Sequence, residues 1–322
     1  MAEPNELPNG VAYAFYDIAH EGAQVRAVAG VVGDKLLEGL KGMVPRSVVV
    51  YAQDGISRAA TNLAVAMHSP LEYPVVTVNR LPRYVGPLDV IVVLTERADD
   101  PQLAADIQVA LQRGCTVIFA GLSEGPLVED VAGRGVVIPH LPTAEGTSPL
   151  RALATVRAVL DSLHGEPLII AQTFVDWASE VDLELEACSP EREEVVNPAR
   201  ELAYISGRII HLGSDPIGDA IAHLACRLWS ANGKVSVAFD REDWALSARK
   251  FPVSDSSIFD DPIDGGGNEL LPLKLIVWNP GVDSDADYGG GAITQSVPVA
   301  DYSNGSALPL RLVARAWAAT AF

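Results

Sequence analysis

Short continuous runs of apolar residues alternate along this chain with segments in which apolar residues recur every three to four positions. A short run is typical of a strand buried on both faces, and the wider spacing is typical of a helix that packs one face against a core. In the first half the pattern predicts five strands and three helices: strands 48–51, 74–79, 90–95, 116–120 and 136–138, and helices 57–67, 101–113 and 148–163. This alternation indicates a doubly wound α/β domain with a parallel sheet.

The pattern starts again after Gly165, where a glycine and the following Pro167 end one helix and open the next. The second half is predicted to contain helices 168–185, 197–207, 216–230 and 308–320 and strands 208–212, 235–239 and 273–278. We therefore expect two α/β domains in tandem, residues 1–165 and 166–322, each a doubly wound parallel sheet. Two stretches rich in Gly, Asp, Ser and Pro, 251–268 and 279–305, are expected to be long loops, and the acidic stretch 180–194 a solvated helix face.

The charge and the cysteine content of the chain limit the kinds of partner, metal site and location to be expected. The 322 residues include 23 basic and 42 acidic side chains, a net charge of −19, which disfavours nucleic acid and anionic membranes as partners. Three widely separated cysteines, Cys115, Cys188 and Cys226, predict neither a disulfide framework nor a zinc site. With no secretory signal pattern and no apolar run of about 18 residues, we expect a cytoplasmic protein without a metal or cofactor.

Two turns are placed where doubly wound sheets bind ligands, at the carboxyl ends of strands and the start of the next helix. They follow strands 48–51 and 208–212. Their candidate ligand-binding residues are Asp54, Gly55, Ser57 and Arg58 in the first turn and Gly213 and Ser214 in the second. The alternative is that Ser57 and Asp215 only cap helices, which such residues commonly do.

Three stretches, 148–154, 197–214 and 231–235, resemble in their order and spacing the bifunctional phosphoglucose/phosphomannose isomerase family. The resemblance extends over nearly the whole chain. It implies two sugar isomerase (SIS) domains of flavodoxin-like fold, a sugar phosphate held between them, and a homodimer. It also implies that Arg151 is an active-site arginine and that Asn232 and Lys234 contact the ligand.

The sequence departs from that family at several chemical positions. Where the family has a hydroxyl-rich phosphate loop, residues 94–100 here include Thr95, Glu96, Arg97 and two aspartates. A carboxylate about 4 Å from a phosphate costs on the order of 1–4 kcal/mol, which Arg97 or Arg58 would partly offset. The family's catalytic glutamate position reads Ala231, and its later histidine and lysine have no counterpart here.

Three hypotheses follow for the function. The first is a diverged family member that binds a sugar or sugar phosphate between its domains, with most catalytic residues replaced. The second is a working aldose–ketose isomerase in which Glu96, Asp99 or Asp54 is the base and Arg151 stabilises the enediolate oxygen. The third is a non-catalytic regulatory or interaction protein. The candidate catalytic residues are Arg151 and Glu96, and Thr95 and Arg97 join the candidate ligand-binding residues.

Overall fold

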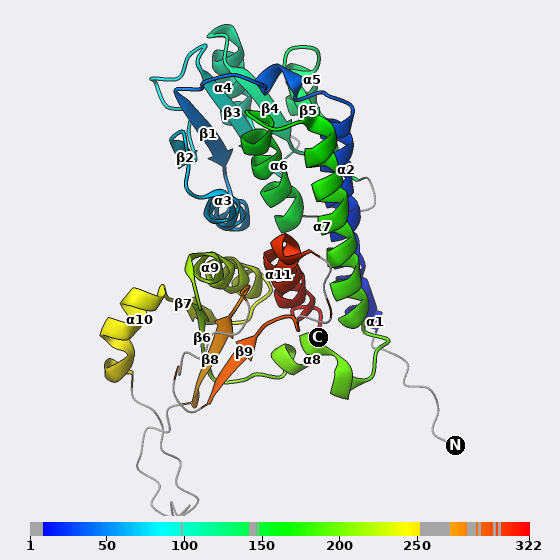
Figure 1. Cartoon of the computed structure of the whole chain (residues 1–322), viewed down its shortest axis with the longest axis vertical. Helices are drawn as coiled ribbons and strands as arrows, with labels where there is room; N and C mark the ends of the chain where they lie inside the picture. The colour runs from blue at the N-terminus through cyan, green and yellow to red at the C-terminus, as the bar shows by residue number, and fades with distance from the viewer. Residues whose placement is uncertain are drawn as a thin grey trace, which may run out of the picture.

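The chain contains two parallel β-sheets, one from each half of the sequence (Figure 1). The structure is a computed structural model, and it describes residues 9–97, 99–141, 146, 148–251, 271–281, 288, 291–298, 301 and 304–322. The first sheet has the strand order β2-β1-β3-β4-β5, and the second has the order β7-β6-β8-β9. In both sheets the chain starts at an inner strand, adds one neighbour, and then crosses to the other side, as in flavodoxin-like folds.

The first sheet is covered on both faces. Its strands are β1 (Ser47–Ala52), β2 (Val75–Val78), β3 (Asp89–Leu94), β4 (Thr116–Ala120) and β5 (Val136–Ile138), and all pair in parallel. Because successive side chains of a strand point to opposite faces, Val48 and Val50 join one core while Val49 and Tyr51 join another. Helices α3 (Gly55–His68) and α6 (Pro149–Ser162) contribute to the first core, and α4 (Pro101–Gln112) and α5 (Pro126–Val131) contribute to the second.

The second sheet is smaller. Its strands are β6 (Arg208–Gly213), β7 (Ser236–Ala238), β8 (Leu273–Trp278) and β9 (Ala292–Gln295), again all parallel. Helices α9 (Pro216–Ala231) and α11 (Leu308–Ala318) pack on one face and share the large core of the first half. Against the other face lies a small apolar cluster that includes Trp244 of α10 (Arg241–Ser247).

Three helices connect the two halves along one side of the molecule (Figure 1). Helix α2 (Glu21–Gly33) packs along α7 (Pro167–Ala187), which also contacts α11, while α1 (Asn9–Ile18) contacts α11. Between the sheets, α3 packs against α9. The other elements among the described residues are α8 (Pro198–Ala203) and the 3-10 helices η1 (Glu38–Leu40), η2 (Glu194–Val196), η3 (Ala248–Lys250) and η5 (Gly305–Ala307).

The predicted strands and long helices are confirmed, with ends that shift by a few residues. The sequence pattern did not predict α1, α2, α5 and α10. The structure also has a strand, β9, within the stretch 279–305 that was expected to be loop. Of the other expected loop, residues 252–268 lie outside the described residues. Within the described part of the chain, no helix has the length and apolar character needed to cross a membrane. No cluster of three or more potential metal ligands occurs among those residues either.

The expectation of a solvated acidic face over residues 180–194 was wrong for its first turn. Glu180 and Glu184 are buried where α7 packs on α11. The Glu184 carboxylate accepts hydrogen bonds from Arg311 Nε at 2.9 Å and Arg315 Nε at 2.7 Å, and Glu180 accepts from Arg311 Nη1 at 3.1 Å. Charge on a helix therefore marks a solvated face only when no opposite charge on a neighbouring helix meets it.

Candidate functional site

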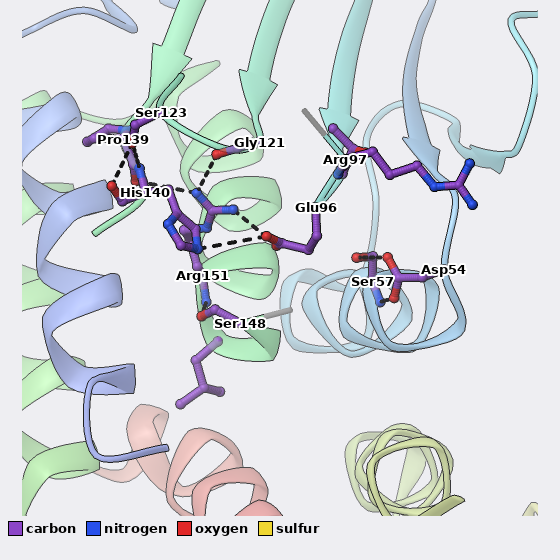
Figure 2. Close-up of polar contacts among 12 residues, drawn as sticks. Asp54, Ser57, Glu96, Arg97, Gly121, Ser123, Pro139, His140, Ser148 and Arg151 are labelled. Carbon is purple, nitrogen blue, oxygen red and sulfur yellow. Dashed lines mark hydrogen bonds and ion pairs between the residues drawn. The ribbon is translucent and has the colours of Figure 1, made fainter. Parts of the chain in front are cut away.

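The candidate site lies at the carboxyl edge of the first sheet, where the strand order reverses between β1 and β3. Glu96 follows β3, Asp54 follows β1, and Gly121 follows β4, while the start of α6 supplies Arg151 (Figure 2). Because all the strands are parallel, these loops meet at one edge of the sheet, where doubly wound folds bind ligands.

Arg151 is the fixed cation of this site. Its side chain is 2 % exposed and donates to Gly121 O at 3.0 Å, Pro139 O at 3.5 Å and Glu96 Oε1 at 3.2 Å (Figure 2). Ser148 caps α6 and accepts a hydrogen bond from the Arg151 amide at 3.1 Å, which sets where the side chain leaves the helix. The two sequence-predicted catalytic residues, Arg151 and Glu96, are thus brought together.

Glu96 also faces a histidine that the sequence did not indicate. His140 Nε2 lies 3.7 Å from Glu96 Oε2, and neither of these buried atoms has a hydrogen-bond partner among the described residues. The backbone of His140 is held by Ser123, whose Oγ donates to His140 O at 2.7 Å. His140 is 5 % exposed.

Burial sets the charge state of this pair. It raises the pKa of Glu96 to about 7, although the neighbouring Arg151 acts in the opposite direction. Burial and the charge of Arg151 both lower the pKa of His140. Near pH 7 we therefore expect a neutral imidazole beside a carboxyl group that is close to half ionised, so their approach is a polar contact rather than an ion pair.

Glu21 of α2 contacts the first turn of α6, next to Arg151, and the sequence did not indicate it either. It is 1 % exposed, its Oε2 accepts from the Leu150 amide at 2.9 Å, and burial raises its pKa to about 8. Glu21 is therefore mostly a neutral acid near pH 7, and it holds the first turn of α6 together with Ser148. No pattern near residue 21 connects this glutamate with α6, because the two segments are far apart in sequence.

The alternative, that Ser57 and Asp215 cap helices, is confirmed for Asp215, the N-cap of α9, and wrong for Ser57. Asp54 is the N-cap of α3, and its carboxylate accepts from the Ser57 amide at 2.8 Å and from Ser57 Oγ at 2.6 Å (Figure 2). Ser57, Thr95, Glu96, Ser148 and Arg151 line a shallow hollow. Because Asp54 is engaged by its own helix, Glu96 is the better placed base.

Residues next to the hollow are tied into a chain of hydrogen bonds. Thr95 Oγ1 donates to Gln53 Oε1 at 3.0 Å, and Gln53 Nε2 donates to Asp100 Oδ2 at 2.8 Å. Arg97 donates to the same Asp100 oxygen at 3.2 Å, and its exposed side chain extends away from Glu96 (Figure 2). Asp99 is exposed as well, so neither residue contacts the hollow.

The second predicted turn does not join this site, because its own backbone closes it. A Cβ atom placed on Gly213 would lie 1.9 Å from the Asp219 amide nitrogen, so β6 and α9 are in direct contact there. Ser214 donates through Oγ to Asn279 Oδ1 at 2.9 Å and through its amide to Trp278 O at 3.0 Å. The structure thus offers no space for a ligand against Gly213.

Asn232 and Lys234 lie beyond the far end of α9 from that turn, roughly 24 Å away for a helix of 16 residues. Lys234 Nζ donates to Leu202 O at 3.3 Å and Ala203 O at 2.6 Å, and it lies 4.3 Å from the centre of the Trp229 ring. Asn232 donates to Leu228 O at 2.9 Å. These contacts stabilise the ends of α8 and α9, and neither residue contacts Glu96 or Arg151.

No protein-family model matches the sequence, and no curated protein sequence matches it. Solved structures do match. The tagatose-6-phosphate ketose/aldose isomerase from Escherichia coli is 13 % identical, with a TM-score of 0.62 over 94 % of this chain and 91 % of that one. The C-terminal domain of glucosamine-fructose-6-phosphate aminotransferase from Francisella tularensis is 9 % identical, with a TM-score of 0.64 over 99 % and 96 %. This chain therefore shares the fold of these two structures, with two doubly wound parallel sheets in tandem, as predicted from its sequence.

Proposed function

We propose that this protein binds a sugar or sugar phosphate at the carboxyl edge of the first sheet and moves a proton on it, as in aldose–ketose isomerisation. One observation carries the proposal: Glu96 Oε2 and His140 Nε2 face each other at 3.7 Å without other partners among the described residues. A ligand hydroxyl between them would satisfy both atoms. A carboxyl group with a pKa of about 7 is also suited to act as base and acid near neutral pH.

In this mechanism each residue of the cluster has one task. The Glu96 carboxylate removes the proton from the carbon next to the carbonyl group and returns it to the neighbouring carbon, so the reaction has no net oxidation. Arg151 uses three of its five N–H groups in the contacts described above, which leaves two that can donate to the enediolate oxygen. Neutral His140 exchanges a proton with the sugar hydroxyl.

The assignment to a specific family and to a specific class of sugar phosphate rests on the sequence. The three motifs support the phosphoglucose/phosphomannose isomerase family, with a hexose 6-phosphate as substrate. The two solved structures named above, both named for sugar phosphates, support a phosphorylated sugar. The division into domains 1–165 and 166–322, the homodimer and the cytoplasmic location stay predictions.

A second candidate function is binding without turnover. It is favoured by the narrowness of the hollow and by the engagement of Ser57 with Asp54, which leaves one hydroxyl fewer for the ligand. In that case the protein would act as a sensor or accessory protein for the same class of sugar.

The test is a proton NMR time course of fructose 6-phosphate in heavy water, with glucose and mannose 6-phosphates as further substrates. We expect conversion with deuterium entering C2. Glu96→Gln keeps the shape of the side chain but cannot accept the proton, and should lower the rate by about 10²–10⁴-fold. The control Glu186→Gln, an exposed position on α7, should leave the rate unchanged.

Three results would contradict the proposed isomerisation. Line broadening without deuterium incorporation would favour binding without turnover. Conversion at the wild-type rate in Glu96→Gln would exclude Glu96 as the base. Unchanged spectra of all three sugar phosphates would contradict both candidate functions for hexose phosphates.

A further inference from the structure

Positive charge gathers at the amino ends of β1, β3 and β4, the edge of the first sheet that lies opposite the Glu96 site. The segments 43–46, 82–88 and 112–114, which precede these strands, contain three arginines and no acidic residue. The aspartate that follows them, Asp89, is buried and pairs with Arg46. In a chain of net charge −19, an acidic surface can approach this edge without meeting an exposed carboxylate of these segments.

Contacts with the loop before β3 join the three arginines into one surface. The Arg46 amide donates to Leu88 O at 2.8 Å, and the Arg46 guanidinium lies 5.6 Å from the centre of the Tyr84 ring. Arg113 Nη1 donates to Arg83 O at 3.1 Å, whereas the Arg83 side chain has no acceptor among the described residues. The exposed side chains of this region are called the cationic surface here: Val44, Arg46, Arg83, Tyr84, Leu88 and Arg113.

Large apolar side chains are exposed among these arginines. Val44 is 75 % exposed, Leu88 64 % and Tyr84 50 %. Tyrosine and arginine are enriched in protein–protein interfaces, and apolar groups that lie exposed together mark surfaces that bind other proteins. The cationic surface therefore fits a partner that is both acidic and apolar.

The second half of the chain carries a surface of this kind at η2 and α8. The segment 191–204 has four glutamates and two arginines, and one of these, Arg200, donates to Pro190 O and lies 5.1 Å from the centre of the Phe322 ring. Val195 is 95 % exposed, the highest fraction among the large apolar side chains of the described residues. An open depression is lined by the residues that are called the acidic surface here: Glu194, Val195, Val196, Glu201 and Tyr204.

The cationic and acidic surfaces cannot meet within one chain. Figure 1 shows the amino ends of β1 and β3 toward the top of the first half, and α8 below α11 in the second half. Helix α7, which runs between these levels, has 21 residues and is therefore roughly 30 Å long. A contact between the two surfaces needs two copies and is of the head-to-tail kind, in which each copy keeps one surface free.

We propose that copies of this protein associate head to tail, with the acidic surface of one copy bound to the cationic surface of the next. Charge favours this arrangement over others, because two copies of net charge −19 repel each other wherever acidic faces meet. The apolar groups on both sides, such as Val195 and Leu88, lose their exposure in the same contact. The inference does not depend on the proposed function, since neither surface includes a residue of the Glu96 site.

Sedimentation velocity of the full chain over a series of protein concentrations tests the contact. The wild type should form larger species as the concentration rises, because each added copy leaves a surface free. Arg83→Glu and Glu194→Arg each reverse one charge at the contact, and each should weaken self-association by about tenfold or more. An equimolar mixture of the two variants should regain a one-to-one complex, because one variant keeps its acidic surface and the other keeps its cationic surface.

The matched controls are Arg249→Glu and Glu186→Arg, which make the same charge changes at exposed positions outside both surfaces and should associate as the wild type does. Arg83 and Glu194 are themselves exposed, and thermal unfolding checks that their variants fold. A wild type that stays monomeric at every concentration, or self-association at the wild-type level in either surface variant, would overturn the proposal. A mixture of the two variants that stays monomeric would contradict the pairing of these two surfaces.

Discussion

Glu96 Oε2 and His140 Nε2 lie 3.7 Å apart at the end of β3, each without another partner among the described residues. Buried polar atoms are normally hydrogen-bonded, so an unpaired donor and acceptor that face each other mark a place for a third group. Arg151 holds the other Glu96 oxygen at 3.2 Å and thereby fixes the direction of the free one. This relationship determines most of what we expect of the site.

The activity should depend on the ionisation of Glu96. Its pKa is raised to about 7 and the carboxylate is the reactive form, so kcat/KM should rise with pH through about 7. Arg151 favours the carboxylate, so Arg151→Ala should move the midpoint to higher pH as well as lower the rate. A pH–rate profile of both proteins checks this. A wild-type profile that is flat between pH 6 and 8, or a midpoint unmoved in the variant, would contradict it.

Burial of Glu21 should make stability depend on pH. The pKa of Glu21 is raised from 4.5 to about 8, so the folded state keeps a proton that the unfolded state releases between these values. The free energy of unfolding should therefore fall as pH rises through this window, by up to about 5 kcal/mol at about 1.4 kcal/mol per pKa unit.

Glu21→Gln removes this titration and keeps an oxygen for the Leu150 amide. Urea unfolding at several pH values between 5 and 8 should give a flatter dependence for this variant. Glu186→Gln should follow the wild type, because Glu186 is exposed. Equal slopes in all three proteins would show that Glu21 does not hold the proton.

The buried ion pairs between α7 and α11 should be essential to the packing of these helices. Glu184→Ala would leave Arg311 and Arg315 buried without their shared carboxylate, at a cost of about 3–5 kcal/mol. Glu186→Ala, on the exposed side of the same helix, should cost little. Urea unfolding compares the two. A loss below about 1 kcal/mol for Glu184→Ala would mean that water or other groups replace the carboxylate.

Replacement of Gly213 and of Gly30 by alanine should change the stability of the protein in opposite directions. At Gly213 the new Cβ would meet the backbone nitrogen of Asp219 at 1.9 Å, so β6 and α9 must separate, and we expect a loss of roughly 2 kcal/mol or more. At Gly30, within α2, a Cβ meets nothing within 4 Å, and the change should stabilise the helix by about 0.5–1 kcal/mol. Thermal unfolding of both variants measures the difference, and similar melting temperatures would contradict this prediction.

The sequence by itself determined the strands and most long helices, because the signals for these elements are local. The apolar runs that form β1 and β3 and the proline that opens α4 all act within a few residues. Asp54 and Ser57 were likewise placed at a helix start from neighbouring residues alone. The sequence pattern did not predict α2, because its many small residues, such as Gly22 and Gly30, obscure the regular spacing of apolar residues along the helix.

Only the tertiary structure decided which distant side chains meet. Glu96 and Arg151 were both candidates, but their contact depends on how the start of α6 is placed beside the residues that follow β3, and His140 joins them from the loop after β5. The same holds for Glu184 with Arg315 and for Gly55 with Arg227. Such contacts depend on how elements pack in space, and burial then sets the charge state of the groups. The sequence thus determines the elements, whereas their packing determines the chemistry of the site.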